Sequence, residues 1–237
     1  MRFPFPILLE TEDLVVLDKP SGLVVHRGFS GDRDSVVDRL AAAGYRGLHT
    51  VHRLDRGTSG ALVLAKHVAA ARALSADFAE SRVAKTYLAL VRGVCPDEMD
   101  VDHAIPSDED GPRVPAQTHI RRLGWVETSS KLREPRYSLV RATPRSGRFH
   151  QVRRHLAHLR HPLVGDTTYG KSEHNHYCRD VFGLARLCLH AETLGLPVRP
   201  GSADLLRVSC PLPADLALGL ARMGFDKLLD ETPPPLG

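Results

Sequence analysis

Short apolar runs recur along the chain and are separated by turn residues, a pattern that predicts many β-strands. We expect strands at residues 14–17, 23–25, 60–66, 85–93, 117–123, 137–142, 187–194 and 205–209. The first two flank Lys19-Pro20-Ser21-Gly22, which is a turn signal. They are therefore expected to form an N-terminal hairpin or a strand–turn–strand unit.

Helical periods appear in other segments. His67 to Arg82 is rich in alanine and places apolar residues four positions apart, and His150 to Arg160 shows similar spacing. We expect helices at 34–44 (capped by Asp32 or Asp34 and ended by Gly44), 67–82, 150–160 and 214–229. The polar segments 97–110 and 170–180 are expected to be loops.

The order of these elements predicts the fold class. Strands arrive in clusters and do not alternate strictly with helices, which favours a mixed α+β sheet over a doubly wound one. The 237 residues contain no internal repeat and no clear linker. We therefore expect one domain over residues 1–237, with two lobes.

Composition narrows the class of protein. Hydrophobic residues make up 42% of the chain, and no apolar run approaches the roughly 18 residues that a membrane span needs. The start, Met1 to Pro6, is too short and too rich in proline for a secretory signal. The four cysteines lie far apart without a Cys-x-x-Cys pair. A reduced, cytoplasmic protein with no membrane partner is the expectation.

Charge is spread unevenly, although the formal net charge is only +4. From Arg121 to Arg160 there are eleven Lys or Arg and two acids, whereas Asp97 to Asp110 holds seven acids and no Lys or Arg. A solvated face explains the acidic run. The basic run predicts a surface for a polyanion, because phosphate attraction depends on clustered cations. Charge alone does not separate RNA from DNA.

The segment His52 to Gly60, HRLDRGTSG, is the densest in functional residue types. It leads into a buried strand, so Asp55 is expected in a tight loop, where the flanking arginines favour an ionised carboxylate. Such a carboxylate can attack a sugar carbon, remove a proton or stabilise positive charge at an anomeric centre. On local features, an aspartate that caps the turn through Thr58 and Ser59 is an equal alternative.

Four segments, in order, resemble the motifs of the RluA family of pseudouridine synthases. They are EDLVVLDKPSG at residues 12–22, HRLD followed by TSG at 52–60, KTYLALV at 85–91, and GRFHQVRRH at 147–155 followed by HPLVGD at 161–166. The matches extend from Glu12 to Ala191. One such motif would be weak, whereas four in register are specific.

The resemblance implies roles for individual residues. Asp55 matches the catalytic aspartate, Tyr87 the tyrosine that stacks on the target base and can accept a proton, and Arg153 the basic residue that pairs with the aspartate. Arg53 matches the residue that fills the gap left by a flipped-out nucleotide, and Leu189 an apolar residue of the pocket. Further substrate contacts are expected from polar residues of the motifs: His52, Arg56, Arg148, His150 and Gln151. The implied fold is a mixed, mainly antiparallel central sheet flanked by helices, with the active site in a central cleft.

The implied reaction isomerises uridine in RNA to pseudouridine. It transfers neither electrons nor phosphate, so no cofactor is expected, and the chain has no P-loop. The spacing of His174, His176, Cys178 and His190 is irregular, so no metal site is expected. Whether Asp55 first attacks C1′ or removes the 2′ proton stays open.

The expected substrate is tRNA. The catalytic motifs start by about Glu12, so an N-terminal S4 RNA-binding domain is not expected. Residues 153–162 and 182–187 resemble a branch of the family that modifies uridine 65 of tRNA, and the Arg- and Lys-rich segment 117–137 is the expected place of RNA selection. An enzyme for another tRNA stem-loop or for 23S ribosomal RNA, and a non-catalytic RNA-binding protein or chaperone, are the alternatives. No protein partner is implied, and a monomer is expected.

Overall fold

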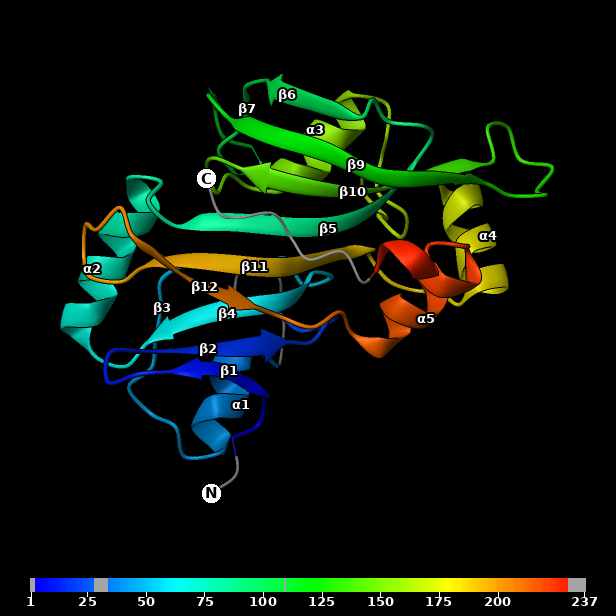
Figure 1. Ribbon diagram of the computed structural model, residues 1–237. Helices are drawn as coiled ribbons and strands as arrows, with labels where there is room; N and C mark the ends of the chain where they lie inside the picture. The colour runs from blue at the N-terminus through cyan, green and yellow to red at the C-terminus, as the bar shows by residue number, and fades with distance from the viewer. Residues whose placement is uncertain (1–2, 28–33, 109, 230–237) are drawn as a thin grey trace. The chain divides into compact units, whose positions relative to one another are not determined.

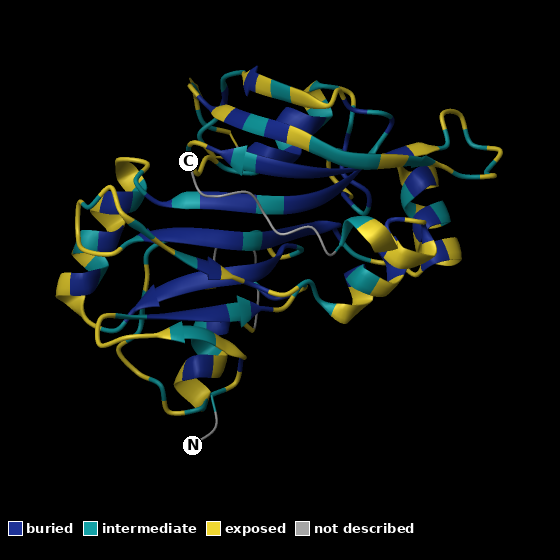
Figure 2. Ribbon diagram, in the orientation of Figure 1, coloured by how far each residue is buried: buried dark blue, intermediate teal, exposed yellow. Residues whose placement is uncertain are grey.

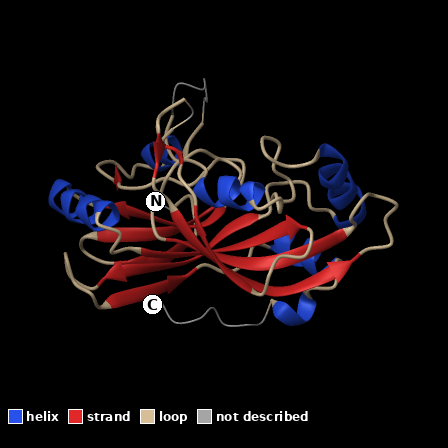
Figure 3. Cartoon of the chain, turned by 90° about the horizontal axis from the view of Figure 1, so that it is seen from above, coloured by secondary structure: helices blue, strands red, loops and turns tan. Residues whose placement is uncertain are grey.

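The computed structural model describes all residues except 1–2, 28–33, 109 and 230–237. The described residues fold into two compact units, each made of two stretches of the chain. Of the described residues, the N-terminal unit contains those within 3–85 and Ala191–Pro211, and the second unit those within Thr86–His190 and 212–229. In each unit the helices lie beside the strands and do not separate neighbouring strands (Figures 1 and 3).

The N-terminal unit is built on strands in the order β1-β2-β4-β11. Its strands are β1 (Ile7–Glu10), β2 (Leu14–Lys19), β3 (His49–Thr50), β4 (Ser59–Ala65), β12 (Leu205–Ser209) and the part of β11 (Leu189–Pro197) that follows His190. Strands β1 and β4 pair antiparallel with β2, β3 with β4, and β12 with β11. Helices α1 (Val36–Ala42) and α2 (Val68–Ala79) complete the unit.

Strand β4 is buried over its whole length because both of its faces are covered. On one face, alternate residues from Ala61 to Ala65 pack against Ala70 and Leu74 of α2. On the other face, Leu64 lies beside residues of α1. Two covered faces explain why the segment is a continuous apolar run and not an alternating one.

The second unit contains strands in the order β5-β10-β9-β6. These are β5 (Ala84–Arg92), β10 (Arg136–Pro144), β9 (Gln117–Glu127) and β6 (Glu98–Asp102), and each neighbouring pair is antiparallel. A separate pair is formed by β7 (Ile105–Pro106) and β8 (Arg113–Val114). The helices are α3 (Gln151–His158), α4 (Ser172–Phe182), α5 (Ala214–Arg222) and the short 3-10 helix η1 (Asp226–Leu228).

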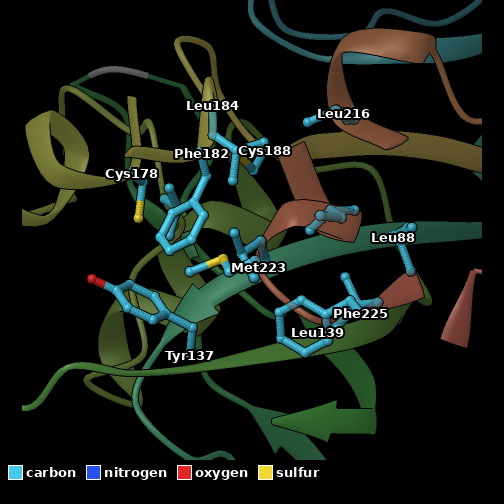
Figure 4. Packing of buried hydrophobic residues seen from close by; sticks show 13 residues of the cluster. Leu88, Tyr137, Leu139, Cys178, Phe182, Leu184, Cys188, Leu216, Met223 and Phe225 are labelled. Carbon is cyan, nitrogen blue, oxygen red and sulfur yellow. The ribbon is translucent and has the colours of Figure 1, made fainter. Parts of the chain in front are cut away.

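Two hydrophobic clusters cover opposite faces of this second sheet. Alternate residues of β5 and β10 point to opposite sides. Leu88, Leu90 and Leu139 pack with residues of α4 and α5 around Tyr137 and Phe225 (Figure 4). The intervening residues of the same strands pack instead against the apolar side of α3. The centres of β5 and β10 are accordingly buried, while β6 and β9, the helices and the connections carry exposed residues (Figure 2).

The predicted α+β class is confirmed, because the strand pairs described above are antiparallel and the helices lie beside them. The N-terminal hairpin, however, is formed by different strands from those expected. Strand β2 pairs with the preceding β1, while Val24 makes only an isolated bridge to Ser35. The segment 23–25 is therefore not a strand of this sheet.

The cap of α1 also differs from the prediction. Ser35 precedes the helix, and its hydroxyl accepts a hydrogen bond from the Asp38 N–H at 3.1 Å. Asp34 instead forms an ion pair with Arg39. The other predicted cap, Asp32, lies outside the described residues.

Three further expectations about elements are corrected. The segment 170–180 is not a loop, because most of it belongs to α4. The acidic segment 97–110 contains β6, which pairs with β9 and so is partly sheet. The C-terminal helix is shorter than expected: α5 ends at Arg222, and Gly224 follows with a φ of 99°.

Candidate active site

The loop that carries Asp55 lies between β3 and β4 in the N-terminal unit. The turn is closed by a backbone bond from Thr58 N–H to the Asp55 carbonyl at 3.1 Å. Thr58 Oγ1 is buried and has no hydrogen-bond partner among the described residues. The Thr58 hydroxyl therefore does not cap this turn, while capping of the turn by Asp55 through Thr58 and Ser59 stays the alternative role.

A second motif, Lys19–Gly22, holds this loop in place, and we call it the Lys19 clasp. The N–H of Gly22 donates to the Arg56 carbonyl at 2.8 Å, and the Ser21 hydroxyl donates to the Gly57 carbonyl at 2.7 Å. These bonds link segments more than thirty residues apart in sequence. They explain physically why the two motifs occur together in one chain.

Lys19 is the central residue of the clasp. Its side chain is fully buried, and its ammonium donates to the carbonyls of Pro20 at 2.8 Å, Leu23 at 2.6 Å and Arg56 at 3.4 Å. A buried ammonium is costly unless its donors are satisfied. The carbonyl oxygens provide that satisfaction, so the loop and the lysine stabilise each other.

Asp55 itself is half-buried, between the exposed Arg53 and Arg56. The intervening Leu54 is 5% exposed and anchors the loop in the core of the unit. The loop thus combines an apolar anchor with a carboxylate and two surface guanidinium groups. This arrangement suits contact with an anionic substrate.

His52 has the contacts of a structural residue. Its Nε2 accepts a hydrogen bond from the Val63 N–H at 3.0 Å, and its ring stacks on Phe78 with centroids 4.6 Å apart. Burial, and then the charge of Lys85, lower the pKa of His52 to about 3. A neutral imidazole that anchors the loop to β4 explains this position, and its predicted contact with substrate remains a prediction.

In the second unit, three predicted site residues lie on one side of the sheet. Tyr87, opposite Ala142 in the ladder, is half-buried and packs on the cluster between this face and α3. Leu189 is a buried member of the same cluster. Arg153 lies on α3 itself and is 8% exposed.

Arg153 forms a two-point ion pair with Asp166. Its Nε donates to Asp166 Oδ2 at 2.8 Å, and its Nη2 donates to Oδ1 at 2.9 Å and to Thr168 Oγ1 at 3.2 Å. Burial raises the pKa of Asp166, but the bonds from Arg153 and from backbone N–H groups outweigh it, so the net pKa is lowered. The carboxylate is therefore ionised beside the guanidinium.

Gln151, predicted to contact substrate, is instead used fully within the unit. Its amide oxygen accepts from the Ser146 hydroxyl at 2.7 Å and from Arg148 N–H at 3.1 Å. Its amide nitrogen donates to the Gln117 carbonyl at 2.8 Å and to Thr118 Oγ1 at 3.1 Å. All four hydrogen-bonding positions are occupied. Gln151 therefore positions the loop before α3, and its predicted contact with RNA remains a prediction.

Two neighbours of Gln151 have different surroundings. Arg148 is exposed and can meet an RNA backbone. His150 adopts the left-handed conformation, with a φ of 53°, and its ring stacks on Phe149 with centroids 3.8 Å apart. Its Nδ1 also lies 3.2 Å from the Tyr169 hydroxyl. His150 is thus part of the packing around α3.

Sequence reasoning missed three charged residues of these motifs. Lys19 and Asp166 belong to the motifs at 12–22 and 161–166, and a charged residue in an apolar context is itself a signal of buried pairing. Lys85, the first residue of the motif at 85–91, is the third of these charged residues. It is 7% exposed, lies 5.9 Å from the Phe78 ring centre, and burial lowers its pKa to about 8. Its position in an apolar strand, two residues before Tyr87, was the feature of the sequence that could have indicated a buried lysine.

The candidate residues therefore fall into two groups. Asp55, Arg53, Arg56 and His52 belong to the N-terminal unit, and Tyr87, Arg153 and Leu189 belong to the second. The pairing of Asp55 with Arg153 stays a prediction.

Within the described part of the chain, no group of three or more His, Cys, Asp or Glu side chains is placed to hold a metal ion. His174 bonds the Tyr137 hydroxyl at 2.8 Å, and Cys178 belongs to the hydrophobic cluster of Figure 4. None of the described helices is both long and apolar enough to span a membrane.

Comparison with known proteins gives consistent results. A family model described as RNA pseudouridylate synthase matches residues 13–158. A tRNA pseudouridine synthase C from Yersinia pestis is 38% identical over 80% of each chain, and one from Salmonella typhimurium is 35% identical over 95% of this chain and 92% of its own. A third, from Pectobacterium carotovorum, is 41% identical over 80% of this chain. The match covers 54% of the length of that relative.

Solved structures agree with the sequence comparisons. The human RNA pseudouridylate synthase domain containing 4 is 28% identical over 92% of each chain, with a TM-score of 0.71. The human RNA pseudouridylate synthase domain containing 1 gives the same identity and TM-score over 89% of this chain and 84% of its own. The motifs, the fold and these relatives agree, and the chain belongs to the RNA pseudouridylate synthase family.

Proposed function

We propose that this chain converts uridine to pseudouridine in tRNA, at uridine 65. The observation that carries the proposal is the similarity, over 80% to 95% of the chain, to proteins named tRNA pseudouridine synthase C. Asp55, Tyr87 and Arg153 are all present at the motif positions that the reaction needs. We further propose that it acts in the cytoplasm as a monomer, without a protein partner.

The reaction breaks the N1–C1′ bond of uridine, turns the uracil and joins it again through C5. In the proposed roles, the Asp55 carboxylate starts the reaction, either at C1′ or at the 2′ proton, and Arg153 stabilises that carboxylate. Tyr87 stacks on the uracil and accepts the proton that leaves C5, while N1 gains a proton. No electrons leave or enter, so the atoms balance without a cofactor.

The target base must first leave its stack, which costs a few kcal/mol. Arg53 is exposed and can enter the space that the base vacates. An aromatic partner such as Tyr87 offsets part of the cost by stacking. The exposed Arg56 and Arg148 then contact phosphates, and Leu189 lines the apolar side of the pocket.

The exposed arginines and lysine of the β9–β10 connection support a place for RNA selection. Lys131 and Arg133 are exposed in this connection, and Arg136 is exposed at the first position of β10. Other cations of the basic segment are used internally, since Arg122 bonds Asp97 and Arg153 bonds Asp166. RNA attraction therefore rests on the connection and on the exposed residues before α3.

Pseudouridine mapping on tRNA transcripts tests the substrate. The purified chain should modify a wild-type transcript at position 65 and leave a transcript with cytidine at that position unmodified. Modification of another tRNA position, or of 23S ribosomal RNA only, would favour a different specificity within the family. Binding of both transcripts without any modification would favour a non-catalytic RNA-binding protein.

Arg153→Ala separates chemistry from binding. We expect the rate constant of pseudouridine formation to fall at least about a hundredfold, while the tRNA dissociation constant changes by less than about threefold, because a group acting at the reaction centre affects the rate and not the binding. The matched control is Arg179→Ala, which removes an exposed arginine that is also paired with an aspartate. An equal loss of rate and binding would make Arg153 only a phosphate contact.

A further inference from the structure

The turn that follows Asp166 surrounds the Arg153 guanidinium on several sides. Asp166 Oδ1, which accepts from Arg153, also accepts the N–H groups of Thr168 at 2.9 Å and Tyr169 at 3.0 Å. The Asp166 carboxylate is fully buried. The carboxylate therefore ties this turn to the Arg153 guanidinium, and the turn in its place fixes the orientation of both groups.

Tyr169 closes the remaining side of this arrangement. Its ring lies 5.2 Å from the Arg153 guanidinium carbon, within cation–π range. Its hydroxyl accepts from Arg154 Nε at 2.8 Å and lies 3.2 Å from His150 Nδ1. The ring is thus held from its far end by two residues of the α3 N-terminal region and cannot tilt freely.

We propose that Asp166 and Tyr169 are positioning residues that fix the orientation of the Arg153 guanidinium for the reaction. This inference rests on the proposed function. Arginine has a flexible side chain, and ordering it costs free energy each time it must act. A guanidinium held by two carboxylate bonds and one aromatic face is ordered before substrate arrives, so less of that cost falls in the transition state.

Two variants test the Asp166 carboxylate and the Tyr169 hydroxyl separately. Asp166→Asn keeps the size of the side chain but removes the charge. Tyr169→Phe keeps the ring under Arg153 and removes only the hydroxyl that Arg154 and His150 hold. We expect single-turnover rate constants lower by at least about tenfold and about threefold, with tRNA dissociation constants within about twofold of wild type. The control, Asp180→Asn, removes an exposed aspartate from its ion pair with Arg179 and should leave the rate unchanged.

A double-mutant cycle tests whether Asp166 affects the reaction rate through Arg153. In an Arg153→Ala background, Asp166→Asn should cause no further loss of rate, because the group that it positions is absent. A merely structural role would lower the rate again by the same factor. Additive losses, or a folded Asp166→Asn enzyme with a wild-type rate, would overturn the proposal; if Asp166→Asn does not fold, Tyr169→Phe and its own cycle with Arg153→Ala decide.

A readout without activity keeps this inference separate from the proposed function. Nuclear magnetic resonance of arginine Nε–H groups should show a slowly exchanging Arg153 signal, assigned by its loss in Arg153→Ala. Exchange should be faster in Tyr169→Phe and unchanged in Asp180→Asn. A fast-exchanging Arg153 signal in the wild-type protein would overturn the positioning role. Absence of pseudouridine formation by a protein with a protected signal would instead overturn the proposed function.

Discussion

At Lys19 the chain places a positive charge at a fully buried position, and the ammonium donates to the backbone carbonyls of Pro20, Leu23 and Arg56, the last of which lies in the loop that carries Asp55. Lys19→Met keeps the length and apolar stem but leaves those carbonyls without a donor. We expect the free energy of unfolding to fall by about 3 kcal/mol, as for buried polar groups that lose their partners. Urea unfolding followed by circular dichroism measures it.

Lys66→Met is the matched control for that change. Lys66 also donates to a carbonyl, that of Thr11 at 2.7 Å, but it is partly exposed and pairs with the exposed Glu10. Its loss should cost less than about 1 kcal/mol, since solvent replaces the contact. Equal costs at the two positions would contradict a special role of the Lys19 clasp.

His52 makes stability depend on pH. Its pKa is about 3 in the folded protein and near 6.5 in the unfolded chain, so protonation favours unfolding. The stabilisation is fully present above pH 6.5 and is lost as the pH falls toward 3, by at most about 1.4 kcal/mol per pH unit. His52→Gln keeps an acceptor for the Val63 N–H and should remove the contribution of His52 to the slope of unfolding free energy against pH.

Unfolding measured between pH 4 and 7 tests this difference. His67→Gln serves as control, because His67 is an exposed histidine that also accepts from a backbone N–H. The control should keep the wild-type slope. An unchanged slope in His52→Gln would show that the imidazole is not held neutral.

At the scale of elements, Gly60 in β4 lies directly against the backbone of the neighbouring strand β11. Gly60 has a φ of 118°, and a Cβ there would lie 2.3 Å from the Ala191 carbonyl oxygen. Gly60→Ala should lower the unfolding free energy by more than about 2 kcal/mol, through both conformation and clash. Gly47→Ala is the control, with a φ of 83° but open space around the Cβ, and should cost about 1 kcal/mol. Similar costs in urea unfolding would mean that the sheet yields at Ala191.

Elements with a clear period were predictable, and the exceptions have physical reasons. Helix α4 was expected to be a loop because two of its three buried positions, His174 and Cys178, are not typical apolar residues. Its period of four becomes visible only when the hydrogen bond of His174 to Tyr137 is known. The apolar pattern predicts a longer C-terminal helix than α5, because it continues past Gly224, whose positive φ is incompatible with continuation of the helix.

The candidate site was predictable as a set of motifs, but its internal contacts were not. Arg153 and Asp166 are thirteen positions apart and meet through a turn after α3. The Lys19 clasp links residues 37 positions apart. No local period carries such pairings, since they depend on how separate elements pack.

At the scale of the whole molecule, the chain crosses between units more than once. Residues 191–211 return to the N-terminal unit after the second unit has been built, and the C-terminal helix belongs to the second. The sequence contains no linker that would mark these crossings. The sequence therefore did not show which stretches of the chain form each unit, although two lobes within one domain were expected, and the contributions of the two units to catalysis must be measured in the full chain.

Tritium release from [5-³H]uridine-labelled tRNA tests the central claim most directly, because C5 loses its hydrogen when it bonds to C1′ in pseudouridine. The wild-type chain should release tritium, Asp55→Ala should release none while still binding tRNA, and the exposed control Asp34→Ala should match the wild type. Equal release by Asp55→Ala, or no release by the wild type from any tRNA or ribosomal RNA, would contradict the role of Asp55 as the catalyst of a pseudouridine synthase.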